Sequence, residues 1–214
     1  MEKTRDEVLP GTHIGCSPVC IQETSKERDR DMLAPVKSTG TKDALRSGLE
    51  ASRLAFHALL DSLSEADFKK KSLNPGWTNE EILFHIALGF FVLLTLLPLA
   101  RCFGRFPKSF SHPLAHVLNS CTIPFNWINA LGTRLAGRMS TPESLGKTFD
   151  WVHARLLKTF DSLHEEEWER CGMYAPTQWD PVSFKDYMTL EDIFRMPLLH
   201  FTFHLKQIAR ENRA

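Results

Sequence analysis

Residues 199–208 read Leu-His-Phe-Thr-Phe-His-Leu-Lys-Gln-Ile, and the interpretation of the chain starts from this stretch. It places His200 and His204 four residues apart. On a helix, side chains with this spacing lie on the same face, one turn apart. A single metal ion could therefore bind both imidazoles. A third ligand would have to come from another segment, and His85 is the matching single histidine.

The segment around His85 begins with residues 77–85, Trp-Thr-Asn-Glu-Glu-Ile-Leu-Phe-His. Thr78 followed three residues later by Glu81 is a capping box, which marks the N-terminus of a helix. His85 lies two turns into this predicted helix. The helix continues through residues 86–100, a run without a single charged side chain.

Three further segments are typical of long amphipathic or capped helices. Leucine and phenylalanine recur at three- and four-residue steps over residues 41–63 and again over 141–163. Thr141 before Pro142, and Thr189 before acidic residues, are helix starts. The last helix is expected to reach about residue 212, with a kink or a restart at Pro197. The pattern predicts an all-α fold, an up-and-down four-helix bundle.

The chain divides into a tail and a bundle. Residues 1–40 are polar and poor in large apolar groups, which predicts a flexible tail. Residues 41–214 form the bundle, with a basic and apolar helical insertion at about 101–140, between the second and third long helices. Within it we expect a loop at 101–111 and a helical stretch at 112–138, interrupted at Pro124. Residues 164–170 should close the third helix, and residues 171–187 should form a structured loop without strands.

The composition excludes several classes of protein. Lys plus Arg and Asp plus Glu balance at 26 each, so no net field draws the chain to nucleic acid. The five cysteines show no Cys-x-x-Cys spacing, which argues against a zinc ribbon or a disulfide framework. The N-terminus leads into no apolar run typical of a secretory signal. We therefore expect a cytoplasmic protein.

In a four-helix bundle, His85 can face His200 and His204. Three neutral imidazoles give a metal ion three nitrogen ligands and leave a coordination position open, as in catalytic zinc sites. Imidazole also suits nickel, iron and copper, and the residues do not distinguish among these metals. The other histidines are interpreted as core or boundary residues (His57, His116, His153) or as loop surface (His112).

Two motifs in this order resemble the DinB-like four-helix-bundle superfamily. They are Trp77-Thr78-x-x-Glu81-Ile82-Leu83-x-His85 and His200-x-x-x-His204-x-x-Gln207-Ile208. The resemblance covers about residues 41–212 and implies that His85, His200 and His204 bind a divalent metal. The superfamily includes S-transferases that use bacillithiol or mycothiol and a mycothiol-dependent maleylpyruvate isomerase, and its members often form dimers. The tail and the insertion depart from a compact member, and the insertion borders the predicted site.

The resemblance implies Lewis-acid chemistry on a small-molecule substrate. A divalent metal (Zn, Ni or Fe) lowers the pKa of a water or thiol that it binds. We therefore expect a thiol-dependent S-transferase or a small-molecule hydrolase, with a low-molecular-weight thiol as a second cofactor and a homodimer as the assembly. No catalytic residue can be assigned. Glu81 is explained by its cap, and Gln207 is placed to orient a ligand or the substrate.

A second hypothesis is a non-catalytic bundle that binds a partner or a membrane through residues 82–140. No Asp or Glu occurs from Ile82 to Pro142. Residues 82–100 approach the ~20 apolar residues of a membrane span and are followed by basic residues. His85 and Pro98 argue against a span, as do the polar residues of a return helix, Asn119, Asn126 and Asn129. Peripheral contact through the basic insertion is a milder form of this hypothesis.

Overall fold

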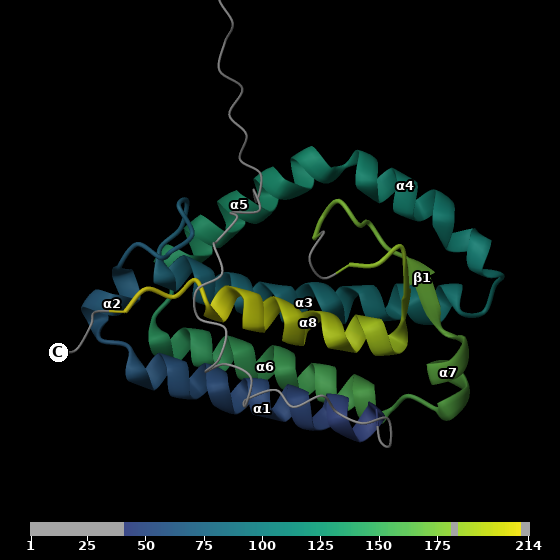
Figure 1. The fold of residues 1–214 in the computed structure, drawn as a ribbon, viewed down its shortest axis with the longest axis horizontal. Helices are drawn as coiled ribbons and strands as arrows, with labels where there is room; N and C mark the ends of the chain where they lie inside the picture. The colour runs from purple at the N-terminus through teal and green to yellow at the C-terminus, as the bar shows by residue number, and fades with distance from the viewer. Residues whose placement is uncertain (1–40, 181–183, 211–214) are drawn as a thin grey trace, which may run out of the picture. The chain divides into compact units, whose positions relative to one another are not determined.

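The computed structural model describes residues 41–180 and 184–210. The predicted flexible tail, residues 1–40, lies outside the described residues. The prediction of an all-α helical bundle is confirmed. Its four long helices are α1 (Thr41–Ser62), α3 (Asn79–Phe103), α6 (Pro142–Asp161) and α8 (Leu190–Leu205). Both α1 and α3 pack against α6 and α8, so α1 and α3 lie at opposite corners of the bundle (Figure 1).

Between α3 and α6 the chain forms two further helices, α4 (His112–Ser120) and α5 (Thr122–Arg138), preceded by the 3-10 turn η1 (Lys108–Ser111). These helices return the chain along the bundle, and α3 and α6 consequently run in the same direction (Figure 1). The four long helices therefore do not alternate strictly in direction. Of the two, α5 makes the broader contact with α3.

Several predicted boundaries within this insertion were wrong. The helix α3 continues to Phe103, because residues 101–103 still complete its hydrogen-bonded turns. The break between α4 and α5 falls at Cys121 rather than at Pro124. Pro124 lies in the first turn of α5, where the backbone N–H groups have no intrahelical partner to lose.

The connection from α6 to α8 also differs from the prediction. Residues 165–170 form a separate short helix, α7 (Glu165–Arg170), rather than the end of α6. The expected loop contains two short antiparallel strands, β1 (Gly172–Tyr174) and β2 (Tyr187–Thr189), in which Met173 pairs with Met188. The short helix α2 (Glu65–Lys69) follows α1. Helix α8 runs through Pro197 without restarting and ends at Leu205, earlier than expected.

Aromatic rings fill the centre of the bundle. Phe56 of α1 stacks on Phe149 of α6 with ring centroids 4.2 Å apart, and Phe90 of α3 meets Phe149 edge-on at 4.8 Å. All three side chains are fully buried. Burying a large apolar side chain contributes roughly 1.5–3 kcal/mol relative to leaving it exposed. These contacts hold α1, α3 and α6 at fixed distances from one another.

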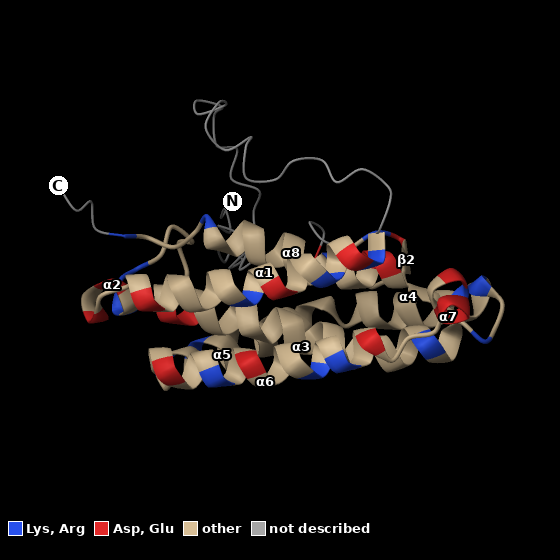
Figure 2. Cartoon of the chain, turned by 90° about the horizontal axis from the view of Figure 1, so that it is seen from below, with Lys and Arg blue, Asp and Glu red and all other residues tan. Residues whose placement is uncertain are grey.

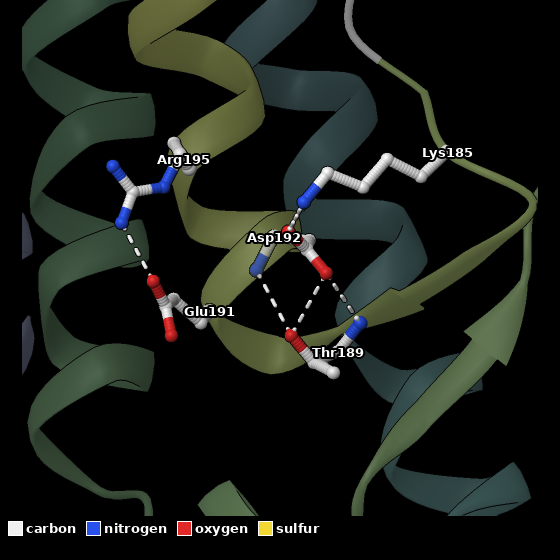
Figure 3. A network of polar contacts seen from close by, with 5 residues as sticks. All are labelled: Lys185, Thr189, Glu191, Asp192 and Arg195. Atoms are coloured by element: carbon white, nitrogen blue, oxygen red, sulfur yellow. Dashed lines mark hydrogen bonds and ion pairs between the residues drawn. The ribbon is translucent and has the colours of Figure 1, made fainter.

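The start of α8 is fixed by a polar network (Figure 3). The hydroxyl of Thr189 accepts a hydrogen bond from the backbone N–H of Asp192, whose carboxylate accepts one from the N–H of Thr189. Lys185 also donates to Asp192, and Arg195 pairs with Glu191. Burial raises the pKa of Asp192, but these bonds outweigh it and keep the pKa below its usual value. The cap sets where the helix that carries His200 and His204 begins.

Among the described residues, α3 is the one helix that is long and apolar enough to cross a membrane, judged by length and composition alone. Half of its most apolar 18-residue window is buried inside the protein. Its buried face packs against α5, α6 and α8. These contacts are those of a core helix in the bundle.

Candidate metal centre

The three histidines singled out from the sequence lie together, on α3 and α8. One ring nitrogen from each of His85, His200 and His204 lies within 4.8 Å of the others. The ring centroids are 4.9 Å apart for His85 and His200, 4.7 Å for His85 and His204, and 4.4 Å for His200 and His204. His85 and His204 are buried, and His200 is nearly so. Atoms this close can share one small cation.

Asn79 fixes the end of α8 against the start of α3. Its buried side-chain amide donates hydrogen bonds to the backbone oxygens of Ala209 at 2.6 Å and Asp67 at 2.7 Å. Its Oδ1 accepts one from the backbone N–H of Ala209 at 3.0 Å. Because Asn79 is six residues before His85 and Ala209 is five after His204, this clamp holds the two histidines in register.

Gly89 allows the ring of His200 to lie against the backbone of α3. A Cβ atom at this position would be 2.6 Å from Cδ2 and 2.9 Å from Nε2 of His200, closer than atoms can pack. Gly89 lies one turn after His85 on the same helix face. The absence of a side chain there lets His85 and His200 approach each other.

Each histidine directs its Nδ1 atom toward an oxygen outside the cluster. Gln207 Oε1 lies 2.8 Å from Nδ1 of His204, and Asp180 Oδ2 lies 3.2 Å from Nδ1 of His200. Thr133 Oγ1 is 3.5 Å from Nδ1 of His85. An amide or carboxylate oxygen accepts a hydrogen bond from Nδ1–H, which favours the tautomer with the free lone pair on Nε2. The same arrangement orients histidine ligands in metal proteins.

The inner nitrogen of His200 is not satisfied within the protein. Its Nε2 atom is buried and has no hydrogen-bond partner among the described residues. A buried polar atom without a partner costs roughly 1–3 kcal/mol, and such atoms are rare. A cation between the three rings would satisfy Nε2 of His200. The residues present therefore fit a bound metal ion.

The environment of the cluster favours the neutral forms of His85 and His204. Burial lowers the pKa of His204 to about 4, and the neighbouring His200 acts in the same direction, against smaller raising contributions from Gln207 and Asp180. Burial, and then the two neighbouring histidines, lowers the pKa of His85 well below 6.5. Metals bind the neutral form of imidazole, so low pKa values favour binding near neutral pH. Three protein ligands is the number found at catalytic zinc sites, whereas structural sites have four.

The sequence pointed to only one of the three residues that contact the Nδ1 atoms of the histidines, their outer partners. Gln207, expected to orient a ligand or the substrate, orients His204. Asp180 and Thr133 were missed, because Asp180 lies in the loop between β1 and β2 and Thr133 lies in the insertion. For Thr133, the sequence offers one signal, a hydroxyl side chain at a position of α5 that faces the bundle. Glu81 has the capping role expected, with its carboxylate accepting from the Thr78 N–H at 2.9 Å, and it also pairs with Arg138 at 2.9 Å.

The four other histidines interpreted from the sequence lie away from the cluster. His153 is buried, and its Nε2 lies 2.9 Å from the backbone oxygen of Leu49. His57 lies 2.8 Å from a carboxylate oxygen of Asp150. His116 is exposed on α4. His112 is exposed as well, but it begins α4 and does not lie in a loop as predicted.

Comparison with known families agrees with this geometry. The family model described as the DinB superfamily matches residues 48–208, which spans all three histidines and the clamp at Asn79. Comparisons with curated proteins and with solved structures found no match. The model covers well over half of the sequence. The chain belongs to the DinB superfamily.

Proposed function

We propose that this chain holds a divalent metal ion on Nε2 of His85, His200 and His204, and that it acts as a thiol-dependent S-transferase or a small-molecule hydrolase. The observation that carries the proposal is the buried Nε2 of His200, which has no partner among the described residues and faces two further imidazoles. The outer oxygens of Gln207 and Asp180 favour the tautomer in which the Nε2 lone pairs are available.

The metal would supply a Lewis acid that polarises a bound group and lowers the pKa of a bound water or thiol. The chain's own residues prepare the site for this chemistry. Gly89 and the clamp at Asn79 hold the three rings at short distance. Trp77 covers the cluster, with its ring centroid 4.6 Å from that of His85, and so limits the access of water on that side.

Family membership supports a thiol as the second cofactor, since the superfamily includes thiol-dependent S-transferases. The thiol would lose its proton at the site, and its sulfur would then bond to an electrophilic carbon of a small molecule. The bond from that carbon to the leaving group would break, and the leaving group would take up the proton. In a hydrolase, water would take the place of the thiol. Both reactions use the same three ligands, and the substrate decides between them.

The first test is metal content. The full chain, purified without added metal, is analysed by elemental mass spectrometry as wild type and as His85→Ala and His204→Ala. We expect close to one metal ion per chain in the wild type and loss of it in both variants. His153→Ala is the matched control, because His153 is also buried but lies outside the cluster. Equal metal content in all four proteins would place the metal elsewhere.

The second test is activity. The protein is stripped with a chelator, reloaded with zinc, nickel or iron, and assayed with thiols plus electrophilic acceptors and with ester and amide substrates. We expect turnover that requires the metal and is lost in His204→Ala. A metal-loaded protein that is inactive in both assays contradicts the enzymatic part of the proposal and leaves the metal site standing.

A further inference from the structure

The helix α5 has its apolar side outward. Ile123 is 83% exposed, Trp127 65% and Leu135 58%, and Ile128, Leu131 and Met139 are exposed on the same side of the helix. Ile123, Trp127, Leu131 and Leu135 follow one another at four-residue steps, with Ile128 and Met139 beside them, and together they form one continuous stripe. Helices at the surface of soluble proteins normally turn this stripe to the core. An exposed apolar stripe of this kind marks a binding surface.

The opposite side of α5 faces the bundle and is partly polar. Thr133 is fully buried and lies against His85 of the metal centre. At Gly137 the backbone of α5 approaches α3 so closely that a Cβ atom would be 2.8 Å from Cα of Glu81. Arg138 of α5 pairs with Glu81. These contacts fix the orientation of α5, so the apolar stripe cannot rotate inward without losing them.

The surface around the stripe is positively charged. Residues 82–142 contain no Asp or Glu. Arg105 and Lys108 are exposed before α4, beside the exposed rings of Phe106 and Phe110. Arg134 lies in the last part of α5, followed by Arg138, whose charge is balanced by Glu81. Cations therefore stand at both ends of the α4–α5 segment, which Figure 1 shows running along one side of the bundle.

This charge pattern decides between two occupants of the surface. In a symmetric contact between two copies, each surface meets itself, so cations would face cations without an acidic residue from the same segment. An anionic lipid surface offers the opposite charge together with an apolar interior for the stripe. Amphipathic helices that lie in membrane interfaces combine basic residues, bulky apolar residues and tryptophan in this way.

We propose that α4 and α5 form a docking surface for an anionic lipid membrane, with Ile123, Trp127 and Leu131 inserted among the lipids and the flanking cations at the headgroups. The protein lies on the membrane and does not span it. Because α5 also covers His85, docking brings the membrane within one helix diameter of the metal centre.

The test is co-sedimentation of the full chain with lipid vesicles, made of phosphatidylcholine alone or of an equimolar mixture with phosphatidylserine. We expect binding to the mixed vesicles and little to the neutral ones. The double variant Ile123→Gln, Trp127→Gln should bind at least about tenfold more weakly, because it removes two of the three inserted apolar groups. Trp151→Gln is the matched control, since Trp151 is 49% exposed but lies on α6.

Two further variants test the contribution of the basic side chains to lipid binding. Arg105→Gln and Lys108→Gln should each weaken binding to mixed vesicles about fivefold, and added salt should weaken the wild type further. Lys147→Gln, an exposed cation on α6, should have little effect. All substituted positions are at the surface, so each variant is expected to unfold at the wild-type temperature, and this is checked by circular dichroism.

Three results would overturn the proposal. The first is no binding to mixed vesicles at lipid concentrations that bind other peripheral proteins. The second is equal loss of binding in Trp151→Gln and in the α5 double variant. The third is light scattering that shows a wild-type dimer and a monomeric α5 double variant, which would identify a second copy as the occupant.

Discussion

The α1–α6 and α3–α8 helix pairs differ in whether their buried histidine nitrogens have hydrogen-bond partners. On α6, His153 is buried and its Nε2 is satisfied by the backbone oxygen of Leu49. On α8, Nε2 of His200 is equally enclosed and has no partner among the described residues. The first histidine completes the core, while the second leaves a polar atom that only an added group can satisfy. Burial alone does not identify a candidate ligand, and neither does a missing partner, since Nε1 of Trp168 is also buried without one. His200 differs because its unsatisfied imidazole lies beside those of His85 and His204.

The two pairs also differ in their charged residues. Side chains of both signs lie along α1 and α6 (Figure 2), and some pair across the two helices, as Arg53 does with Asp150 at 2.7 Å and Arg46 with Asp161 at 3.1 Å. Helix α3 has no charged residue between Glu81 and Arg101. The α1–α6 pair is thus stabilised by contacts typical of a surface-exposed helix pair, whereas the α3–α8 pair encloses the site.

The largest effect is expected from pH. The folded pKa of His204 is about 4, against 6.5 in the unfolded chain, so between these values the unfolded state holds more protons. The free energy of unfolding of the metal-free protein should therefore fall as pH drops from 6.5 to 4, by about 3 kcal/mol from His204 alone. His85, whose pKa is also lowered, adds to this. Urea unfolding at a series of pH values measures it.

The matched variants separate the two helix pairs. His85→Gln with His204→Gln should flatten the pH dependence in this window. Asp150→Asn should leave it unchanged, because the pKa of Asp150 lies below 3.8 in the folded protein and its contribution is lost only at lower pH. An unchanged slope in the double histidine variant would show that these groups do not titrate as inferred.

The next effect is steric. Gly89→Ala places a methyl group 2.6 Å from the ring of His200 and should displace it. We expect a loss of about 1–3 kcal/mol in stability from overpacking and at least about tenfold weaker metal binding, measured by titration with zinc. Gly146→Ala on α6, where the new methyl group would be 3.1 Å from His57, gains the same helix propensity. It should keep wild-type zinc affinity, and a loss there equal to that of Gly89→Ala would refute the assignment.

A smaller effect on stability is expected from Asp180 and Gln207, the outer partners of the histidines, although zinc binding should still weaken. Asp180→Asn and Gln207→Ala each remove an oxygen that fixes a ring, and each should weaken zinc binding by about 10–100-fold. The fold should persist, since Asp180 lies in a loop and Gln207 follows α8. Zinc titration of each variant, with Asp186→Asn from the same loop as the control, measures the change.

The smallest effect is expected in the α1–α6 pair. Arg53→Gln breaks the ion pair with Asp150, whose partners are each more than a third exposed. Exposed pairs contribute only about 0–1 kcal/mol, so thermal unfolding should shift little and zinc affinity should not change. A shift comparable to that of Gly89→Ala would mean that the two helix pairs do not differ as described.

Local sequence signals accounted for much of the fold. The caps at Thr78, Thr141 and Thr189 start α3, α6 and α8, because a side-chain oxygen near a free backbone N–H acts within one turn. The four-residue spacing of His200 and His204 likewise fixed their common face. The break predicted at Pro124 was wrong, because a proline is tolerated in the first turn of a helix. Whether Pro124 lies in a first turn depends on where the helix begins.

The rest of the site depends on contacts between distant segments. Asp180 reaches His200 only because β1 and β2 pair and hold the intervening loop near α8. Thr133 reaches His85 only because Gly137 lets α5 pack closely on α3. Neither pairing leaves a periodic signal in the sequence. The three clustered histidines could therefore be predicted, while two of their three outer partners could not.

The most direct test of the metal centre is anomalous scattering from crystals of the full chain, with data collected at the absorption edge of the metal found by elemental analysis. We predict one anomalous peak at about 2.0–2.1 Å from Nε2 of His85, His200 and His204. We also expect Asp180 and Gln207 still to bond to the outer nitrogens. A metal-loaded crystal whose only peak lies away from these three atoms, or whose His200 Nε2 is satisfied by a protein group, would contradict the proposed metal site.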